Sequence, residues 1–142
     1  MTHYRLDANR QTLVLAAPSD GLPHCTYWGA RLPDGADLAT IAATAEVDLT
    51  GGMLDANPLL TLCPQTSAAF PGQTGLHVRR PDGTPLLTVF AQTATKLADS
   101  LSLSYSDEEL GLTLTFRFTA NAVTGIITAQ TVLDACDPVL CD

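Results

Sequence analysis

The stretch Leu112-Thr-Leu-Thr-Phe-Arg-Phe118 decides the fold class of this 142-residue chain. Its large apolar residues alternate with Thr and Arg, and successive side chains of a β-strand point to opposite faces. The leucines and phenylalanines therefore share one face, and the threonines and the arginine share the other. This pattern predicts a strand with one buried and one solvated face, which is typical of an antiparallel sheet packed on a second layer.

Segments on both sides of this stretch have the same character. Leu101-Ser-Leu-Ser-Tyr105 alternates in the same way, and Asp107-Glu108-Glu109 follows it as a charged turn. Residues 125–133 have the composition of a further strand. Upstream, residues 76–80 and 86–91 flank a Pro-Asp-Gly-Thr turn and are expected to pair with each other.

The N-terminal part predicts a third group of elements. Tyr4–Asp7 and Gln11–Ala17 are expected to form an antiparallel hairpin, and His24–Trp28 is expected to form another strand. Residues 37–46 are the one convincing helix candidate, with an Asp at the N-cap position. Gly and Pro punctuate residues 47–75 heavily, so this part is expected to be irregular.

These elements together predict a mainly β fold, an antiparallel β-sandwich with at most one short helix. Residues 1–142 are long enough for a single domain with a real core. The last segment, 134–142, has the composition of a turn that leads into another strand. A sheet cut at that point leaves an edge uncovered, so we expect an N-terminal fragment of a longer polypeptide.

The charge balance excludes two classes of partner. The formal net charge is −8, and Arg79-Arg80 is the only adjacent pair of basic residues. Nucleic acids and anionic membranes require a basic footprint, so neither is an expected partner. A neutral partner, such as a sugar or another protein surface, fits this balance.

The lack of a recognisable targeting signal and the pattern of cysteines both predict a reducing compartment. The N-terminal residues show no signal-peptide pattern, and no apolar run approaches the roughly 20 residues that span a bilayer. The expected location is the cytoplasm. The four cysteines form neither a Cys-x-x-Cys motif nor a regular framework, which favours free thiols, although the last two are near enough in sequence to bridge a tight loop. They are Cys25, Cys63, Cys136 and Cys141.

No residue pattern indicates catalysis, a metal or a cofactor. Asp and Glu fall almost entirely in turns or irregular segments, where solvated turn residues are expected. His24 and Cys25 are adjacent on a predicted strand and so point to opposite faces, and we expect a buried, inert Cys25. The three histidines lack metal-ligand spacing.

Tyr27-Trp28 leaves two interpretations open. Aromatic faces stack on the C–H surfaces of sugars, and Trp28 is the only tryptophan. In the first interpretation one ring fills the core and the other packs under residues 31–57. In the second, one of the two rings lines a sugar cleft together with Arg31. The candidate substrate-binding residues are therefore Tyr27, Trp28 and Arg31.

The order of segments is similar to the amino-terminal domain of family 36 glycoside hydrolases, which are chiefly α-galactosidases. The resemblance is colinear and covers nearly the whole chain. It is carried by Tyr4-Arg-Leu-Asp7, Tyr27-Trp28-Gly29, Arg31-Leu32, Leu62-Cys-Pro-Gln65, Phe70-Pro-Gly72, Gly75-Leu-His-Val-Arg79, Pro81-Asp-Gly83, the strand pair ending at residue 91, Leu110-Gly-Leu-Thr-Leu114 and residues 125–133.

The resemblance implies a non-catalytic role for this chain. In that family the amino-terminal domain is a β-supersandwich of the galactose-mutarotase type, and a (β/α)₈ barrel that follows it carries the two catalytic aspartates. The chain would scaffold that barrel, which makes the catalytic barrel its first partner. It would also help to shape the cleft for α-galactoside sugars and to assemble oligomers.

Two other functions remain open. A free-standing carbohydrate-binding module would need an exposed aromatic platform on a closed sandwich. An enzyme of the sugar-epimerase type would need His and Glu to converge in a sheet cleft, whereas Glu46, Glu108 and Glu109 lie off the predicted strands.

Overall fold

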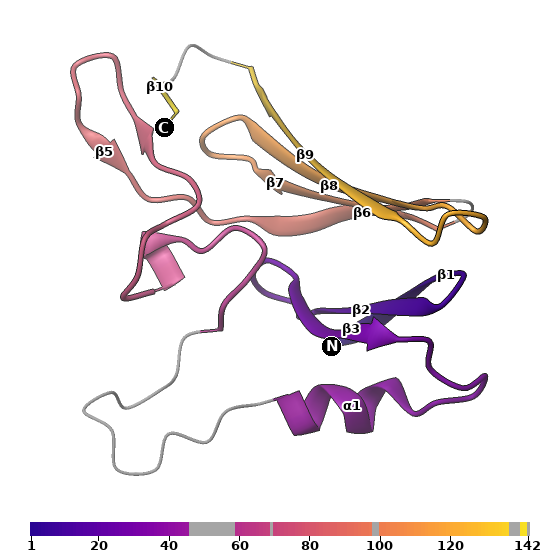
Figure 1. Cartoon of the computed structure of the whole chain (residues 1–142). Coiled ribbons are helices and arrows are strands. Elements are labelled where there is room, and N and C mark those ends of the chain that lie inside the picture. The colour runs from indigo at the N-terminus through magenta and orange to yellow at the C-terminus, as the bar shows by residue number, and fades with distance from the viewer. Residues whose placement is uncertain (46–58, 69, 98–99, 137–139, 142) are drawn as a thin grey trace.

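The computed structural model describes residues 1–45, 59–68, 70–97, 100–136 and 140–141. Two antiparallel sheets stack face to face (Figure 1). The first has the order β1-β2-β3 and consists of β1 (Thr2–Ala8), β2 (Gln11–Ala17) and β3 (His24–Ala30). The second has the order β6-β7-β8-β9 and consists of β6 (Ala91–Leu97), β7 (Ser100–Asp107), β8 (Leu112–Ala120) and β9 (Ile127–Ala135).

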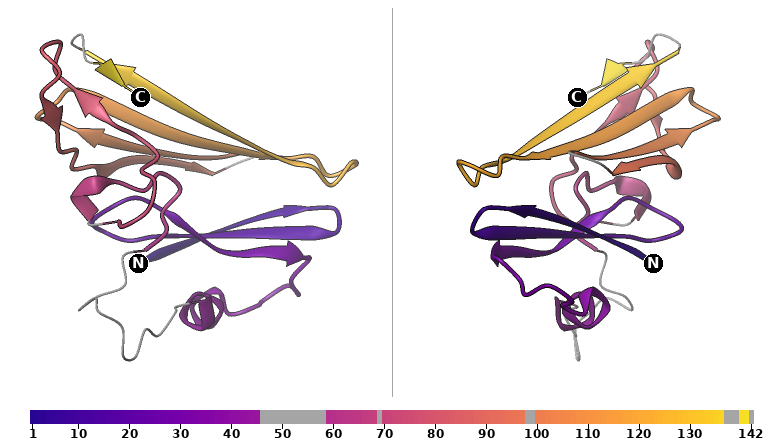
Figure 2. Two further views of the ribbon diagram at one scale, coloured as in Figure 1. Left: turned by 60° about the vertical axis from the view of Figure 1, so that its left-hand side comes forward. Right: turned by 90° about the vertical axis from the view of Figure 1, so that its right-hand side faces the viewer.

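Smaller elements cover the outside of these layers. The helix α1 (Leu38–Ala45) lies on the face of the three-stranded sheet that points away from the four-stranded sheet (Figures 1 and 2). A short 3₁₀ turn, η1, spans Thr66–Ala68. A third, small sheet with the order β10-β4-β5 consists of β4 (Val78–Arg79), β5 (Pro85–Leu86) and β10 (Leu140–Cys141). The prediction of a mainly β, antiparallel fold with one short helix is confirmed.

The core lies between the two large sheets. On β8, Leu112, Leu114, Phe116 and Phe118 are all buried, as the alternation predicts. They meet the alternate buried residues of β7, where Tyr105 packs edge-to-face on Phe116 with ring centroids 6.1 Å apart. From the opposite sheet, β1 and β2 contribute Leu6, Leu13 and Leu15 to the same cluster.

Helix α1 begins where the sequence predicts. The Asp37 carboxylate accepts hydrogen bonds from the backbone N–H groups of Ala39 and Thr40, at 3.0 and 3.2 Å, as an N-cap residue does. Ala42 is the buried residue of the helix, and α1 packs against β3. The hairpin β1–β2 and the strand β3 also occur at their predicted places.

The pairing of residues 76–80 with 86–91 is only partly confirmed. The observed pair is limited to β4 and β5, and residues 87–90 leave the small sheet to connect it with β6. The backbone N–H of Val89 donates 2.7 Å to the side-chain carboxylate of Asp107, the last residue of β7. Strand β6 was not predicted, because Ala91-Gln-Thr-Ala-Thr contains no large apolar residue.

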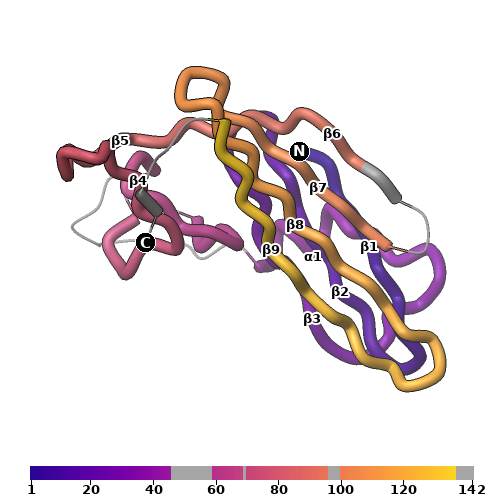
Figure 3. The backbone as a smooth tube through the Cα atoms, turned by 90° about the horizontal axis from the view of Figure 1, so that it is seen from above, coloured from indigo at the N-terminus to yellow at the C-terminus, as the bar shows by residue number. Residues whose placement is uncertain are grey.

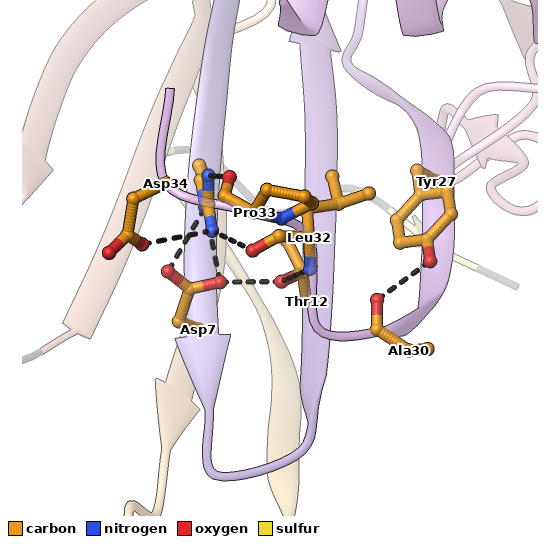
Figure 4. A network of polar contacts seen from close by, with 8 residues as sticks. Asp7, Thr12, Tyr27, Ala30, Leu32, Pro33 and Asp34 are labelled. Atoms are coloured by element: carbon orange, nitrogen blue, oxygen red, sulfur yellow. Dashed lines mark hydrogen bonds and ion pairs between the residues drawn. The ribbon is translucent and has the colours of Figure 1, made fainter. Parts of the chain in front are cut away.

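A polar network fixes the outer face of the β1–β2 hairpin (Figure 4). Arg5 Nε donates to both oxygens of Asp7 at 3.1 and 3.0 Å, and the guanidinium donates to the carbonyls of Leu32 and Pro33. Thr12, which is fully buried, donates to Asp7 at 2.5 Å and accepts from Leu32 N–H at 3.0 Å. The network therefore ties the chain after β3 back onto β1 and β2.

The same network sets the protonation of Asp7. Burial alone would raise the pKa of Asp7, but the hydrogen bonds from Thr12 and Arg5 and the charges of Arg5 and Arg31 hold it below 3.8. A carboxyl group whose pKa is lowered on folding stabilises the folded state at pH values above its unfolded pKa, and this contribution is lost as the pH falls through the folded pKa.

We predict that Asp7→Asn lowers the free energy of unfolding by about 1–2 kcal/mol at neutral pH, because it removes charge-assisted hydrogen bonds at a partly exposed site. The difference from wild type should shrink as the pH falls below about 4. Urea unfolding at a series of pH values measures it. Asp34→Asn is the matched control, since Asp34 lies 3.9 Å from Arg5 with a 94% exposed side chain, and it should change little. An equal effect of both variants at every pH would contradict the assignment.

Candidate functional site

The structure places Tyr27 and Trp28 on opposite faces of β3. Tyr27 pairs with Val14 and lies on the side of α1, where its hydroxyl donates 2.7 Å to the carbonyl of Ala30 (Figure 4). Trp28 pairs with Leu13 and lies on the face that points toward the four-stranded sheet. Neither ring belongs to the buried core cluster. The first interpretation of the pair, with one ring filling the core, is therefore not observed.

Trp28 is the more exposed of the two aromatic residues, with 59% of its surface accessible. Its indole Nε1 donates 2.9 Å to Gln11 Oε1, and the Gln11 amide in turn donates to the carbonyl of Gly125 in the β8–β9 turn. The ring is thus held by a polar chain that links both sheets. Two further apolar side chains of that turn, Val123 and Ile126, are also exposed.

The exposed candidate residues lie at this end of the sandwich. The β1–β2 and β8–β9 turns lie side by side there (Figures 1 and 2), and Asn9 Nδ2 donates 3.4 Å to the carbonyl of Val123. Arg31 follows β3 and is exposed, and its backbone N–H donates 2.8 Å to the carbonyl of Arg10. Trp28 and Arg31 therefore lie at the same end of the molecule, whereas the Tyr27 ring lies on the α1 side.

A polar groove crosses the outer face of the four-stranded sheet. It has a volume of about 690 Å³, is open to solvent, and contains one charged group, the exposed guanidinium of Arg117, among hydroxyl and amide groups. Its lining residues are Ser100, Ser102, Arg117, Thr119, Thr128 and Gln130. The alternation of β7 and β8 explains this composition, since their Ser and Thr side chains share the face opposite to the core.

The thiols are unpaired in the described part of the chain. Cys25, Cys63 and Cys136 are free, and the side chain of Cys141 lies outside the described residues. The prediction of a buried Cys25 is wrong: the residue is exposed, because β3 is an edge strand and its inner face is not fully covered. Partial desolvation still raises the pKa of the Cys25 thiol, which makes it a weak nucleophile at neutral pH.

The carboxyl groups with shifted pKa values hold a strand, a helix N-terminus and a turn in place. Among the described residues these are Asp7, Asp37 and Asp82, and all three pKa values are lowered. For Asp37 the main cause is the hydrogen bond from the Thr40 side chain, and for Asp82 it is the backbone N–H of Thr84. A general acid requires a carboxyl pKa that is raised toward neutrality, so these groups do not have that character.

Asp107 was expected in a solvated turn, and this expectation is wrong. The residue is buried, and its two carboxylate oxygens accept hydrogen bonds from the backbone N–H groups of Val89 and Leu110, at 2.7 and 3.0 Å. The carboxylate therefore fixes the β7–β8 turn and the connection to β6. Sequence reasoning missed it because an Asp before two Glu residues has the composition of a solvated turn.

Within the described ranges, no three His, Cys, Asp or Glu side chains come together in a way that would hold a metal ion. In the same residues no helix has the length and apolar character needed to cross a bilayer.

Comparison with known proteins finds similarity at the level of structure. No family model and no curated protein sequence matches the chain. Among solved structures, GH36 α-galactosidase AgaA from Geobacillus stearothermophilus matches with a TM-score of 0.69 at 17% identity, and a variant of it in complex with 1-deoxygalactonojirimycin matches with 0.72 at 14%. The α-galactosidase from Lactobacillus brevis matches with a TM-score of 0.68 at 13% identity.

The matches cover most of this chain but only a small part of each enzyme. The two Geobacillus structures cover 94% of this chain, while the chain covers 22% of each of them, and for the Lactobacillus enzyme the values are 92% and 21%. The chain therefore spans about a fifth of the length of these enzymes. The described residues have the fold of one part of the GH36 α-galactosidases.

Proposed function

We propose that this chain is the non-catalytic N-terminal β-sandwich region of an α-galactosidase-like glycoside hydrolase. The observation that carries the proposal is the structural match to GH36 enzymes, which spans nearly all of this chain and about a fifth of theirs. The role of the sandwich is to scaffold a catalytic barrel on a separate stretch of polypeptide and to contribute to the substrate cleft. We assign residues 1–142 to one domain, part of a supersandwich.

The chemistry of the described residues supports this role. Retaining glycoside hydrolysis uses two carboxyl groups about 5–5.5 Å apart, one of them an acid with a raised pKa. Asp37 and Asp82 cap a helix and a turn, while Asp7 and Asp107 hold strands and connections in place. These carboxylates are occupied by backbone and side-chain donors. The free thiols also favour a reducing, cytoplasmic compartment.

Within that role we assign Trp28 and Arg31 to the wall of the substrate cleft. Both are exposed at one end of the sandwich, and the hydrogen bond to Gln11 holds the Trp28 indole in a fixed orientation. A fixed and exposed aromatic face suits the apolar C–H face of a sugar ring, and the Arg31 guanidinium at the same end of the sandwich is a donor for sugar hydroxyl groups. Tyr27 belongs to the same candidate set, but its ring lies on the α1 side and supports the strand from behind.

The proposal predicts that this chain alone does not hydrolyse an aryl α-galactoside, since the reaction requires an acid and a nucleophile that the proposal assigns to the barrel. The measurement is the release of the aryl alcohol at pH values from 4 to 8, with an intact α-galactosidase as the positive control. Turnover above the blank that co-purifies with the chain and disappears on its thermal unfolding would contradict the proposal.

A free-standing carbohydrate-binding module is the second candidate, because Trp28 is exposed on an ordered strand. Titration with galactose and raffinose, followed by the fluorescence of this single tryptophan, separates the two. If the cleft is completed only by a barrel, we expect no saturable change up to millimolar sugar. A saturable change that Tyr27→Ala leaves intact, together with calorimetric binding of the same sugar that Trp28→Ala abolishes, would instead favour the binding module.

A further inference from the structure

The polar groove on the outer face of the four-stranded sheet lies over β7, β8 and β9, and Figure 3 looks onto this face. Its lining residues stand in two rows across the strands, since the register pairs Arg117 with Ser102 on one side and with Gln130 on the other. The second row consists of Ser100, Thr119 and Thr128. The two rows cover roughly 10 by 7 Å, because neighbouring strands lie about 4.8 Å apart and same-face residues of one strand lie about 7 Å apart.

The hydroxyl groups outside the groove on the same face bond to one another. Toward the β7–β8 turn, the hydroxyl oxygens of Ser104 and Thr115 lie 3.1 Å apart, and those of Ser106 and Thr113 lie 3.2 Å apart. In contrast, the side chains that line the groove form no hydrogen bond with any other described residue. Their hydroxyl and amide groups are therefore available to a ligand.

Arg117 gives the groove a positive charge that no carboxylate compensates. Its guanidinium is exposed and forms no ion pair within the described part of the chain. The sequence has 15 Asp and Glu residues but 7 Lys and Arg residues, so most cations could have found an acidic partner. Asp134, which lies opposite Thr113, is two rows and roughly 14 Å farther along the sheet.

These groups suit a ligand with one negative charge and several hydroxyl groups. A guanidinium presents its N–H donors in a planar fork that fits the oxygens of a carboxylate or a phosphate. Hydroxyl and amide side chains both donate and accept hydrogen bonds, as the hydroxyl groups of a sugar do. A bare oxyanion on Arg117 would leave the second row unused, whereas a pyranose ring with an acidic substituent is long enough to reach both rows.

We propose that this groove binds an acidic monosaccharide. The carboxylate or phosphate group of the ligand lies on Arg117, and its hydroxyl groups bond to the Ser, Thr and Gln side chains of the two rows. Binding on the face of β8 that points away from the core leaves the buried residues in place. This site goes beyond the role in a glycoside hydrolase and does not rest on it, because all the groups that it uses belong to the described residues.

A matched set of ligands tests the need for both the charge and the ring. The ¹⁵N-labelled chain is titrated with galactose, galacturonate and galactose 6-phosphate, and with acetate and inorganic phosphate as anions without a ring. We expect saturable shifts of the backbone amides of β7, β8 and β9 with at least one acidic sugar, and none with galactose at the same concentrations. The expected dissociation constant is on the order of 1 mM, because the site is open to water. The acidic sugar that binds more tightly identifies the acidic group.

Substitutions at Arg117 test its assignment. Arg117→Gln removes the charge but keeps a polar side chain, and it should raise the dissociation constant by about tenfold or more. Arg117→Lys keeps the charge without the planar fork and should have a smaller effect. Arg10→Gln is the matched control, since Arg10 is also exposed but lies in the β1–β2 turn of the other sheet, and it should leave the constant unchanged. Far-UV circular dichroism checks that the variants fold.

Three results would overturn the proposal. The first is the absence of a saturable shift with both acidic sugars. The second is binding of galactose, acetate or inorganic phosphate as tight as that of the acidic sugars, because either the charge or the ring would then contribute nothing. The third is an equal loss of binding in R117Q and R10Q, because the net charge of the chain and not the groove would then hold the ligand.

Discussion

The burial of β2 on both of its faces is the constraint that places the other layers. Leu13 and Leu15 point into the core shared with the four-stranded sheet, while Val14 and Ala16 are buried on the side of α1. Burying a Val or Leu side chain contributes about 1.5–3 kcal/mol relative to exposure. A strand that is apolar on both sides requires two coverings, and the chain supplies β7 and β8 on one side and the helix with the segment after β3 on the other.

The buried polar groups hold the connections between these layers. Asp7 and Thr12 anchor the segment that leads from β3 to α1, and Asp107 anchors both the β7–β8 turn and the approach to β6. Each carboxylate replaces solvent with backbone or side-chain donors, which is why it tolerates partial or full burial. These acids are structural, and this is consistent with a chain whose proposed role is to support a reaction carried out elsewhere.

Sequence patterns predicted the elements with a clear local signal. Strand β8 followed from its alternate Leu and Phe, the β1–β2 hairpin followed from the short spacing between two strand-like segments, and Asp37 predicted the start of α1. Strand β6 could not be predicted, because its inner-face residues Gln92 and Thr95 lie at the rim, where Gln92 donates 2.6 Å to Thr95 and no large apolar residue is required. Residues 87–90 alternate like a strand but connect two sheets.

The candidate site depends on strand order, which local sequence does not specify. The pair Tyr27-Trp28 predicted an aromatic on each face of β3, and this is observed. Which of the two rings would be exposed depends on β3 being an edge strand beneath a wider sheet, and that is a property of the whole sandwich. The same holds for Cys25, whose exposure contradicted the expectation from residue type.

Native-state hydrogen exchange tests the central claim that the described chain folds around β2 as a single packed sandwich. Amides of β2, β7 and β8 should exchange slowest and with one common free energy, equal to that of global unfolding, because the strands share a single core. Amides of the edge strands β3 and β6 should exchange faster. Exchange of β2 at the rate of the loops, while β7 and β8 stay protected, would contradict the account, since the two sheets would then not form one core.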